Sequence, residues 1–368
     1  MKQGWKTYRL GDLCDTISDS YKGCADEVVL INTSDVLEGK CLNHTKEPNR
    51  NLKGQFKKTF KKYDILYSEI RPANKRFAYI DFDATNYIAS TKLMVLRHNE
   101  KIEPLYLYYI LQSQSIIDEL QMLAESRSGT FPQITFAELS RLEVKLPNRE
   151  VQRQILGILG AIDDKIENNR RINTNLELQA QALYKQWFVD NRKDDWEKKK
   201  LESIIDIGSG KGLARIDFVE DGLYPILGAN GQIGRTNNFL IDKKDNVLFT
   251  GRVGTLGNVF RLQQKRAWLS DNTLIITPKK KYYNYVYFFL KSSNLKDFNV
   301  GSTQPLIRQS DIKEMDILIP DYLTLEAFEN KCIAMFDKIN QANAEIDSLA
   351  TLRDTLLPKL MNGEIITK

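Results

Sequence analysis

The chain has 368 residues, 42% hydrophobic and 27% charged, so it is long enough for two domains with buried cores. No apolar run approaches the ~20 residues of a membrane span, and the N-terminal MKQGWKTYRL lacks the apolar core of a signal peptide. The four cysteines lack paired zinc spacing, and Cys41-x-x-His44 has no second half. We therefore expect a cytoplasmic protein without a metal site.

The net charge of +5 is mild but unevenly distributed. Five lysines lie between positions 53 and 62, and further lysine runs occupy residues 198–200 and 279–281. Such runs are usually solvated surface, so by themselves they only permit a polyanionic partner.

An internal repeat organises the chain. WKTYRLGDL, from Trp5, matches WEKKKLESI, from Trp196; YDILYSEIRP (63–72) matches DNVLFTGRVG (245–254); and GTFPQITFAELSRLEVKLPN, ending at Asn148, matches STQPLIRQSDIKEMDILIPD, ending at Asp321. The offset falls from 191 to 173 residues, as expected for two diverged copies of one fold with loops of different length. Each middle segment is predicted to be a β-strand that leads into a turn.

A long helix is predicted after each copy. Apolar residues recur with a period of 3.5 from Ile155 to Trp187, and adding 173 gives a second seam from Phe328 to Leu360. Matching phase favours antiparallel pairing of the two helices over two separate surface helices, and Asn169 and Asn173 are interpreted as polar residues that set the register. The principal seam positions are Leu159, Ile162, Ile166, Asn169, Leu176, Leu183, Met335, Ile339, Ile346, Leu349 and Leu356.

Together these features resemble the specificity (S) subunit of type I restriction–modification systems. The matching pieces are the Trp-x-x-x-x-Leu opening of each half, the Thr-containing stretch before Leu-Pro or Ile-Pro, the helix LGAIDDKIENNRRINTNLELQAQALYKQWF and the terminal LLPKLMNGEI. The resemblance implies an α+β fold with two pseudo-twofold-related target-recognition domains, residues 1–147 and 191–320. An antiparallel coiled coil of two spacer helices, residues 148–190 and 321–368, would separate them.

The resemblance also implies a function. Each domain would read one half of a bipartite site in double-stranded DNA, and two modification (M) subunits would dock on the helices. The M subunits would use S-adenosylmethionine, this chain would bind no cofactor, and restriction (R) subunits would complete the complex. The family usually has Glu-Gln after the proline at the first helix start, whereas here Val151 separates Glu150 from Gln152 and the second copy lacks the glutamine.

The segment IIDIGSGKG (204–212) offers a different function, a self-sufficient S-adenosylmethionine-dependent DNA methyltransferase with a Gly-rich cofactor loop. The corresponding LCDTISDSYKG lacks the first two glycines, and Lys211 is followed by Gly212 rather than the Ser or Thr of a Walker A motif. The residues that follow resemble short strands with Gly/Asn turns rather than βα units. His44 and His98 are the only histidines, and no catalytic constellation is found, so we expect a non-catalytic protein.

DNA recognition would need cations for phosphates and amides, hydroxyls or guanidinium groups for base edges. Arg252 is the sharpest candidate because GRVGTLG surrounds it with glycines, and Asn230 and Gln232 have amides suited to adenine. The candidates in the first half are Lys53, Lys57, Lys58, Arg71, Lys75, Arg76 and Arg127, and those in the second are Lys211, Arg215, Asn230, Gln232, Arg235, Arg252 and Arg266.

Overall fold

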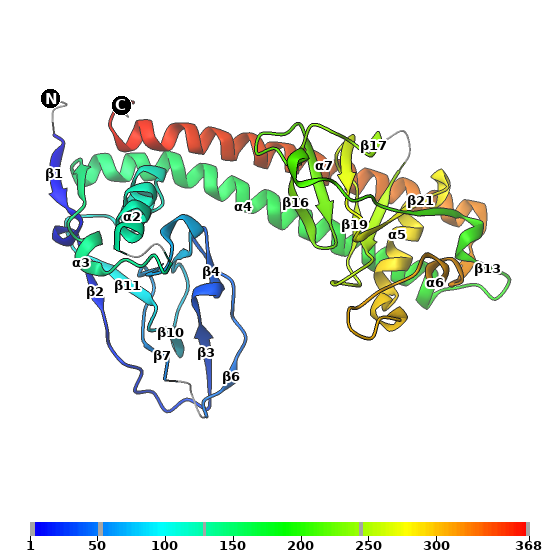
Figure 1. Ribbon diagram of the computed structural model, residues 1–368, viewed down its shortest axis with the longest axis horizontal. Helices are drawn as coiled ribbons and strands as arrows, with labels where there is room; N and C mark the ends of the chain where they lie inside the picture. The colour runs from blue at the N-terminus through cyan, green and yellow to red at the C-terminus, as the bar shows by residue number, and fades with distance from the viewer. Residues whose placement is uncertain (1–3, 51–53, 128–129, 243–245, 366–368) are drawn as a thin grey trace. The chain divides into compact units, whose positions relative to one another are not determined.

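The computed structural model describes residues 4–50, 54–127, 130–242 and 246–365, and it forms two compact units of mixed helix and sheet (Figure 1). Unit 1 comprises residues 1–166 and 347–368, and unit 2 comprises residues 167–346. The unit boundaries therefore cross both long helices. None of the described helices is long and apolar enough to span a bilayer.

Unit 1 contains two four-stranded sheets, ordered β6-β3-β10-β7 and β2-β11-β8-β9, in which only β3 and β10 pair in parallel. A separate hairpin joins β4 to β5, and β1 pairs with β12. The strands are β1 (Lys6–Arg9), β2 (Cys14–Ile17), β3 (Glu27–Ile31), β4 (Val36–Leu37), β5 (Lys40–Cys41), β6 (Glu47–Pro48), β7 (Phe56–Lys58), β8 (Ile65–Ser68), β9 (Phe77–Tyr79), β10 (Tyr87–Ser90), β11 (Leu93–His98) and β12 (Glu143–Leu146).

Three shorter helices complete unit 1, namely α1 (Pro104–Leu111), α2 (Gln114–Arg127) and α3 (Phe136–Leu139). Buried residues of α1 and α2 form one core with β8, β11 and the first turns of the long helix α4 (Arg149–Lys185). A second core is formed by buried residues of both sheets, such as Ile31 of β3 and Leu66 of β8. The apolar–polar alternation of β12 suits its place in a two-stranded sheet, where it pairs with β1.

Unit 2 repeats the same strand order, with sheets β16-β15-β20-β17 and β14-β21-β18-β19 and a single parallel pair, β15 with β20. β13 pairs with β22 as β1 pairs with β12. The elements are β13 (Glu197–Lys200), β14 (Ile205–Ser209), β15 (Tyr224–Gly228), β16 (Gly231–Thr236), β17 (Ile241–Asp242), β18 (Leu248–Gly251), β19 (Val259–Arg261), β20 (Arg266–Leu269), β21 (Thr273–Pro278), α5 (Tyr283–Ser292), α6 (Gln309–Lys313) and β22 (Asp316–Ile319).

The strand registers correct one part of the sequence repeat. Ser68 of β8 lies opposite the first residue of β11, and Gly251 of β18 lies opposite the first residue of β21. Ser68 therefore corresponds to Gly251, an offset of 183, whereas the sequence match paired it with Thr250. Both strands are buried at every position, and this continuous burial hid the one-residue slip, which changes the face of every side chain that is compared.

The two long helices are α4 (Arg149–Lys185), continued by a π-helical turn at Gln186–Asp190, and α7 (Tyr322–Met361). Asn148 and Asp321 cap them at equivalent positions, each accepting a backbone N–H of the first turn at 3.0 Å. All the predicted seam positions are buried or partly buried. These residues thus form the inward face of each helix, as the heptad pattern predicted.

Contacts between the two helices are antiparallel within each unit. In unit 1, Arg353 Nη1 of α7 bonds Asp163 Oδ1 of α4 at 3.1 Å. In unit 2, Asn169 Nδ2 bonds Glu345 Oε2 and Asn173 Nδ2 bonds Asn343 Oδ1, both at 2.7 Å. The two asparagines thus pair with polar groups of α7.

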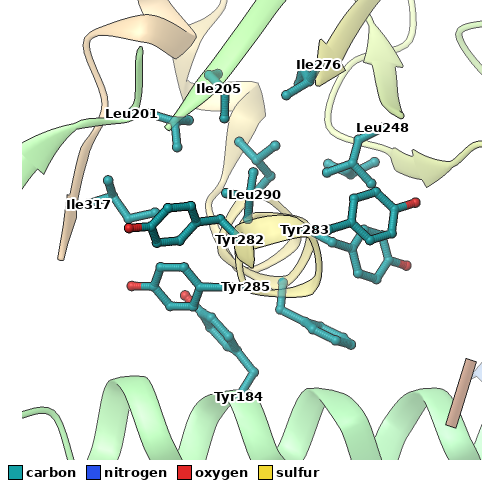
Figure 2. Packing of buried hydrophobic residues seen from close by; sticks show 14 of the residues in the cluster. Tyr184, Leu201, Ile205, Leu248, Ile276, Tyr282, Tyr283, Tyr285, Leu290 and Ile317 are labelled. Carbon is teal, nitrogen blue, oxygen red and sulfur yellow. The ribbon is translucent and has the colours of Figure 1, made fainter. Parts of the chain in front are cut away.

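Aromatic side chains cluster in the core of unit 2. Figure 2 shows Tyr282, Tyr283 and Tyr285 around the start of α5, with Tyr184 rising from α4. Phe188 packs edge-on against Tyr285 and Phe328, with ring centroids 4.7 and 4.9 Å apart. Edge-to-face aromatic pairs contribute about 0.5–1.5 kcal/mol beyond area burial. The sheet-bearing part of unit 2 is therefore held firmly on its own stretches of α4 and α7.

Candidate nucleic-acid interface

The loop between β8 and β9 presents two cations in unit 1. Arg71 and Lys75 flank a short 3-10 helix at Pro72–Asn74, and both have left-handed backbone conformations, with φ of 45° and 52°. The loop is anchored because Arg71 N–H donates to the Pro132 carbonyl at 3.1 Å and Ala73 N–H donates to Gln121 Oε1 of α2 at 3.1 Å. Arg71 is exposed and Lys75 is half-buried. A fixed loop of this kind can position cations for phosphate contacts.

Two other cations of unit 1 are bound inside the unit. Lys58 Nζ donates to the carbonyls of Thr91 and Leu93 at 3.0 and 2.8 Å, and burial lowers the pKa of its ammonium group. Arg76 Nη1 donates to the Ser34 carbonyl at 3.1 Å and to Val36. These contacts give Lys58 and Arg76 structural roles.

The remaining candidates of unit 1 differ in position. Lys57 is exposed on β7, and Arg127 is the last residue of α2. Lys53 lies outside the described residues. The candidates Lys57, Arg71 and Lys75 thus lie on two separate elements, β7 and the β8–β9 loop.

In unit 2, an amide network joins the turn between β15 and β16 to the loop between β18 and β19. Asn230 Nδ2 donates to Thr255 Oγ1 at 2.9 Å, and Asn258 Nδ2 donates to Asn230 Oδ1 at 3.4 Å. The side chain of Asn230 therefore already has partners at both ends of its amide, so it would have to exchange them to read adenine. Gln232, on β16, is exposed. Sequence reasoning missed Thr255 and Asn258, whose only signal was their place in the glycine-rich loop.

Two arginines of unit 2 are held by its own chain. Arg266 pairs with Asp242 Oδ2 at 3.0 Å, and its guanidinium carbon lies 4.6 Å from the Phe239 ring centroid. Arg235 Nε donates to the Gly222 carbonyl at 2.6 Å. Both side chains therefore brace loops, and neither is free to rotate toward a ligand without losing these contacts.

Lys211 and Arg215 are exposed, and Lys211 N–H donates to the Leu269 carbonyl at 2.9 Å. Arg252 is half-buried at the end of β18, and its N–H donates to the Asn272 carbonyl at 2.7 Å. The turn from Leu269 to Asn272 therefore brings Lys211 and Arg252, far apart in the sequence, to one place in unit 2.

The segment 204–212 is part of a sheet rather than a cofactor loop. Gly208 of β14 pairs with Ile275 of β21. A Cβ on Gly210 would lie 2.1 Å from the Ser270 carbonyl oxygen, so glycine is required there by close backbone packing. The packing gives no support to a methyl-donor site.

Cys41 and His44, the possible half of a metal motif, both make contacts within unit 1. Cys41 Sγ donates to the Asn43 carbonyl, and His44 Nδ1 lies 2.9 Å from the Tyr87 hydroxyl. Within the described parts of the chain, no three His, Cys, Asp or Glu side chains gather as metal ligands would.

A family model described as "Type I restriction modification DNA specificity domain" matches residues 2–178 and 193–342. The chain belongs to this family. The HindI type I restriction enzyme specificity subunit of Haemophilus influenzae is 32% identical over 98% of this chain and 99% of its own length. The MjaIX specificity subunit of Methanocaldococcus jannaschii is 25% identical over 71% of this chain and 68% of its own.

A solved structure shares the fold. The type I restriction–modification system S subunit from M. genitalium aligns with 98% of this chain and 97% of its own, with a TM-score of 0.56 and 18% sequence identity. The family and its relatives confirm the resemblance found in the sequence. They are specificity subunits, so this chain is non-catalytic and is not a self-sufficient methyltransferase.

Proposed function

We propose that this chain is the DNA sequence-recognition subunit of a type I restriction–modification complex and that each unit reads one half of a bipartite site. The observation that carries the proposal is the repetition of one strand order in two units whose equivalent loops differ in chemistry. Each mismatched base pair costs about 1–3 kcal/mol, so two short half-sites together discriminate better than either alone.

The two long helices form the second part of the proposal. They would act as an antiparallel coiled coil that sets the distance between the half-sites and docks two modification subunits. The polar pairs of Asn169 with Glu345 and Asn173 with Asn343 support a fixed register. The modification subunits, rather than this chain, would bind S-adenosylmethionine, and restriction subunits would complete the complex.

Genome-wide methylation mapping tests the function. Cells that express the modification subunits with this chain should methylate a bipartite motif, and cells without the chain should not. Absence of any chain-dependent motif would contradict DNA recognition. Calorimetry on the chain alone tests the cofactor assignment, and measurable binding of S-adenosylmethionine would contradict it.

A further inference from the structure

Glu69 and Arg252 occupy the same position in the two copies of the fold, directly after β8 and β18. The backbone of each residue makes two hydrogen bonds. Its N–H donates to the turn before β11 or β21, and its carbonyl accepts from an isoleucine that lies far along the chain. These bonds run from Glu69 N–H to Lys92 O (3.0 Å), Ile134 N–H to Glu69 O (2.9 Å), Arg252 N–H to Asn272 O (2.7 Å) and Ile307 N–H to Arg252 O (3.0 Å). The backbone is thus equivalent, but the side chains have opposite charges.

In unit 1, the side chain at this position, Glu69, forms ion pairs with lysines of the same unit. The Glu69 carboxylate lies 4.0 Å from Lys58 Nζ and 3.9 Å from Lys92 Nζ. Lys58 also donates to the backbone of the β10–β11 turn, as described above. The glutamate therefore interacts with two local lysines, one of which holds a turn in place.

In unit 2, the same place carries an unbalanced positive charge. Among the described residues, Arg252 forms no ion pair, and its Nε is buried without a hydrogen-bond partner. Thr250 Oγ1 and Ser270 Oγ, on β18 and at the β20–β21 turn, are also buried without partners in the described structure. Buried donors left unsatisfied cost about 1–3 kcal/mol each.

We propose that Arg252 is a specificity-determining residue that reads a guanine in the half-site bound by unit 2, and that Glu69 has no such role in unit 1. This inference rests on the proposed function. Guanine O6 and N7 are two adjacent acceptors that match the two-pronged donor geometry of arginine. The backbone bonds of Arg252 fix the base of the side chain, so less freedom is lost on binding. A Cβ added at the left-handed Gly254, two residues further on, would meet no atom within 4 Å, so the space beside this loop residue is open.

The test compares variants in complex with the modification subunits, using competition binding to duplexes in which each base pair of the two half-sites is changed singly. Arg252→Gln should lose roughly 5- to 150-fold of the preference for guanine at one position of one half-site, because one bidentate contact is removed. Preferences at all other positions should remain.

Two matched variants serve as controls. Glu69→Gln changes the equivalent position of unit 1, and Lys265→Gln removes one exposed charge elsewhere in unit 2; both should keep every base preference. If Arg252→Gln keeps the guanine preference, or lowers affinity equally for all duplexes, the inference is wrong. A uniform loss would identify a phosphate contact instead.

If Arg252→Gln binds no DNA, base preference is measured on Arg252→Lys instead. Lysine keeps the positive charge but lacks the two-pronged donor geometry of arginine. Reduced guanine preference with retained affinity supports base reading, whereas wild-type preference or a complete loss of binding overturns it. A wild-type complex without any half-site preference would instead contradict the proposed function, so the two failures can be told apart.

Discussion

Arg71 and Gly254 occupy the same left-handed backbone position in the two units. Their φ angles are 45° and 81°, and each N–H donates to the carbonyl of an equivalent proline, Pro132 or Pro305. The first copy places a cation at this turn, and the second copy places the residue that adopts the turn without strain. The left-handed conformation that this turn requires is therefore adopted by an arginine in unit 1 and by a glycine in unit 2.

The turn at Gly254 predicts a backbone effect on stability. Gly254→Ala should lower the free energy of unfolding by about 1–2 kcal/mol, because an L side chain is strained in the left-handed region. No neighbour lies within 4 Å of the added Cβ, so a steric clash is not involved. Urea unfolding measures the change. Gly157→Ala, on the exposed surface of α4, is the control and should stabilise by up to about 1 kcal/mol.

Replacing Arg71 or Arg76 by glutamine should have two different effects, a loss of DNA affinity at Arg71 and a loss of stability at Arg76. Arg71→Gln should weaken DNA binding equally for all sequences and reduce the salt dependence of log K by about one phosphate contact. Arg76→Gln should instead lower stability, because Arg76 binds backbone carbonyls within unit 1. Binding titrations at several salt concentrations distinguish the two. An unchanged salt slope for Arg71→Gln would remove it from the interface.

Gln152 predicts a structural cost at the start of α4. It is fully buried; its Oε1 accepts the Glu103 N–H at the start of α1 at 2.9 Å, and its Nε2 donates to the Pro147 carbonyl at 2.9 Å. Gln152→Leu would leave these groups unsatisfied and should destabilise unit 1 by about 1–3 kcal/mol or more. Chemical unfolding of Gln152→Leu beside Gln179→Leu, an exposed change on the same helix, measures the difference; equal effects would contradict this role.

Asp321 predicts an acid-sensitive cap. Its pKa lies well below the usual value because Lys193 and the Thr324 backbone and hydroxyl bond the ionised form. A depressed pKa means that the stability is present above the unfolded value, about 3.9, and is lost as pH falls through the folded value. Asp321→Asn keeps a capping oxygen but does not titrate.

Unfolding midpoints measured from pH 6 to pH 2 check this prediction. The wild-type protein should be the more stable at pH 6, and the difference from Asp321→Asn should narrow below about pH 4. A difference that stays constant over the whole range would show that the ionised carboxylate makes no special contribution.

The helix pair predicts a change of DNA spacing under the proposed function. Removing one heptad from each helix, residues 170–176 and 338–344, deletes Asn173 and Asn343 together and keeps Asn169 in register with Glu345. Seven residues span roughly 10 Å of helix, close to three base pairs of DNA. Methylation mapping should show a spacer shorter by about that number. An unchanged spacer would refute the role of the helices in setting the distance.

The sequence predicted the parts of the fold that depend on local pattern. Period-3.5 spacing identified the inward face of both long helices. The repeat matched β1 to β13, and these strands pair with equivalent strands of their units, β12 and β22. It did not resolve the offset of 183 at β8 and β18, because both strands are buried at all four positions, and continuous buried runs match almost equally well when shifted by one residue.

The candidate interface was harder to predict because long-range partners decide which cations are free. Lys58 and Arg266 looked equivalent to Arg71 and Arg252 as basic residues near turns. Their partners, the Leu93 carbonyl and Asp242, lie 35 and 24 residues away in the sequence. Only the folded chain shows that the first two are bound internally and that Arg252 is not.

The composition of unit 1 has a consequence for biosynthesis. Its core includes Leu357 and Leu360 from the end of the chain, packed with residues such as Leu159. A ribosome adds about 5–20 residues per second, so the roughly 200 residues after position 166 require about 10–40 s. During that interval the nascent first unit lacks part of its core, while the continuous second unit has all of its residues earlier. The half that is translated first is therefore the half that finishes folding last.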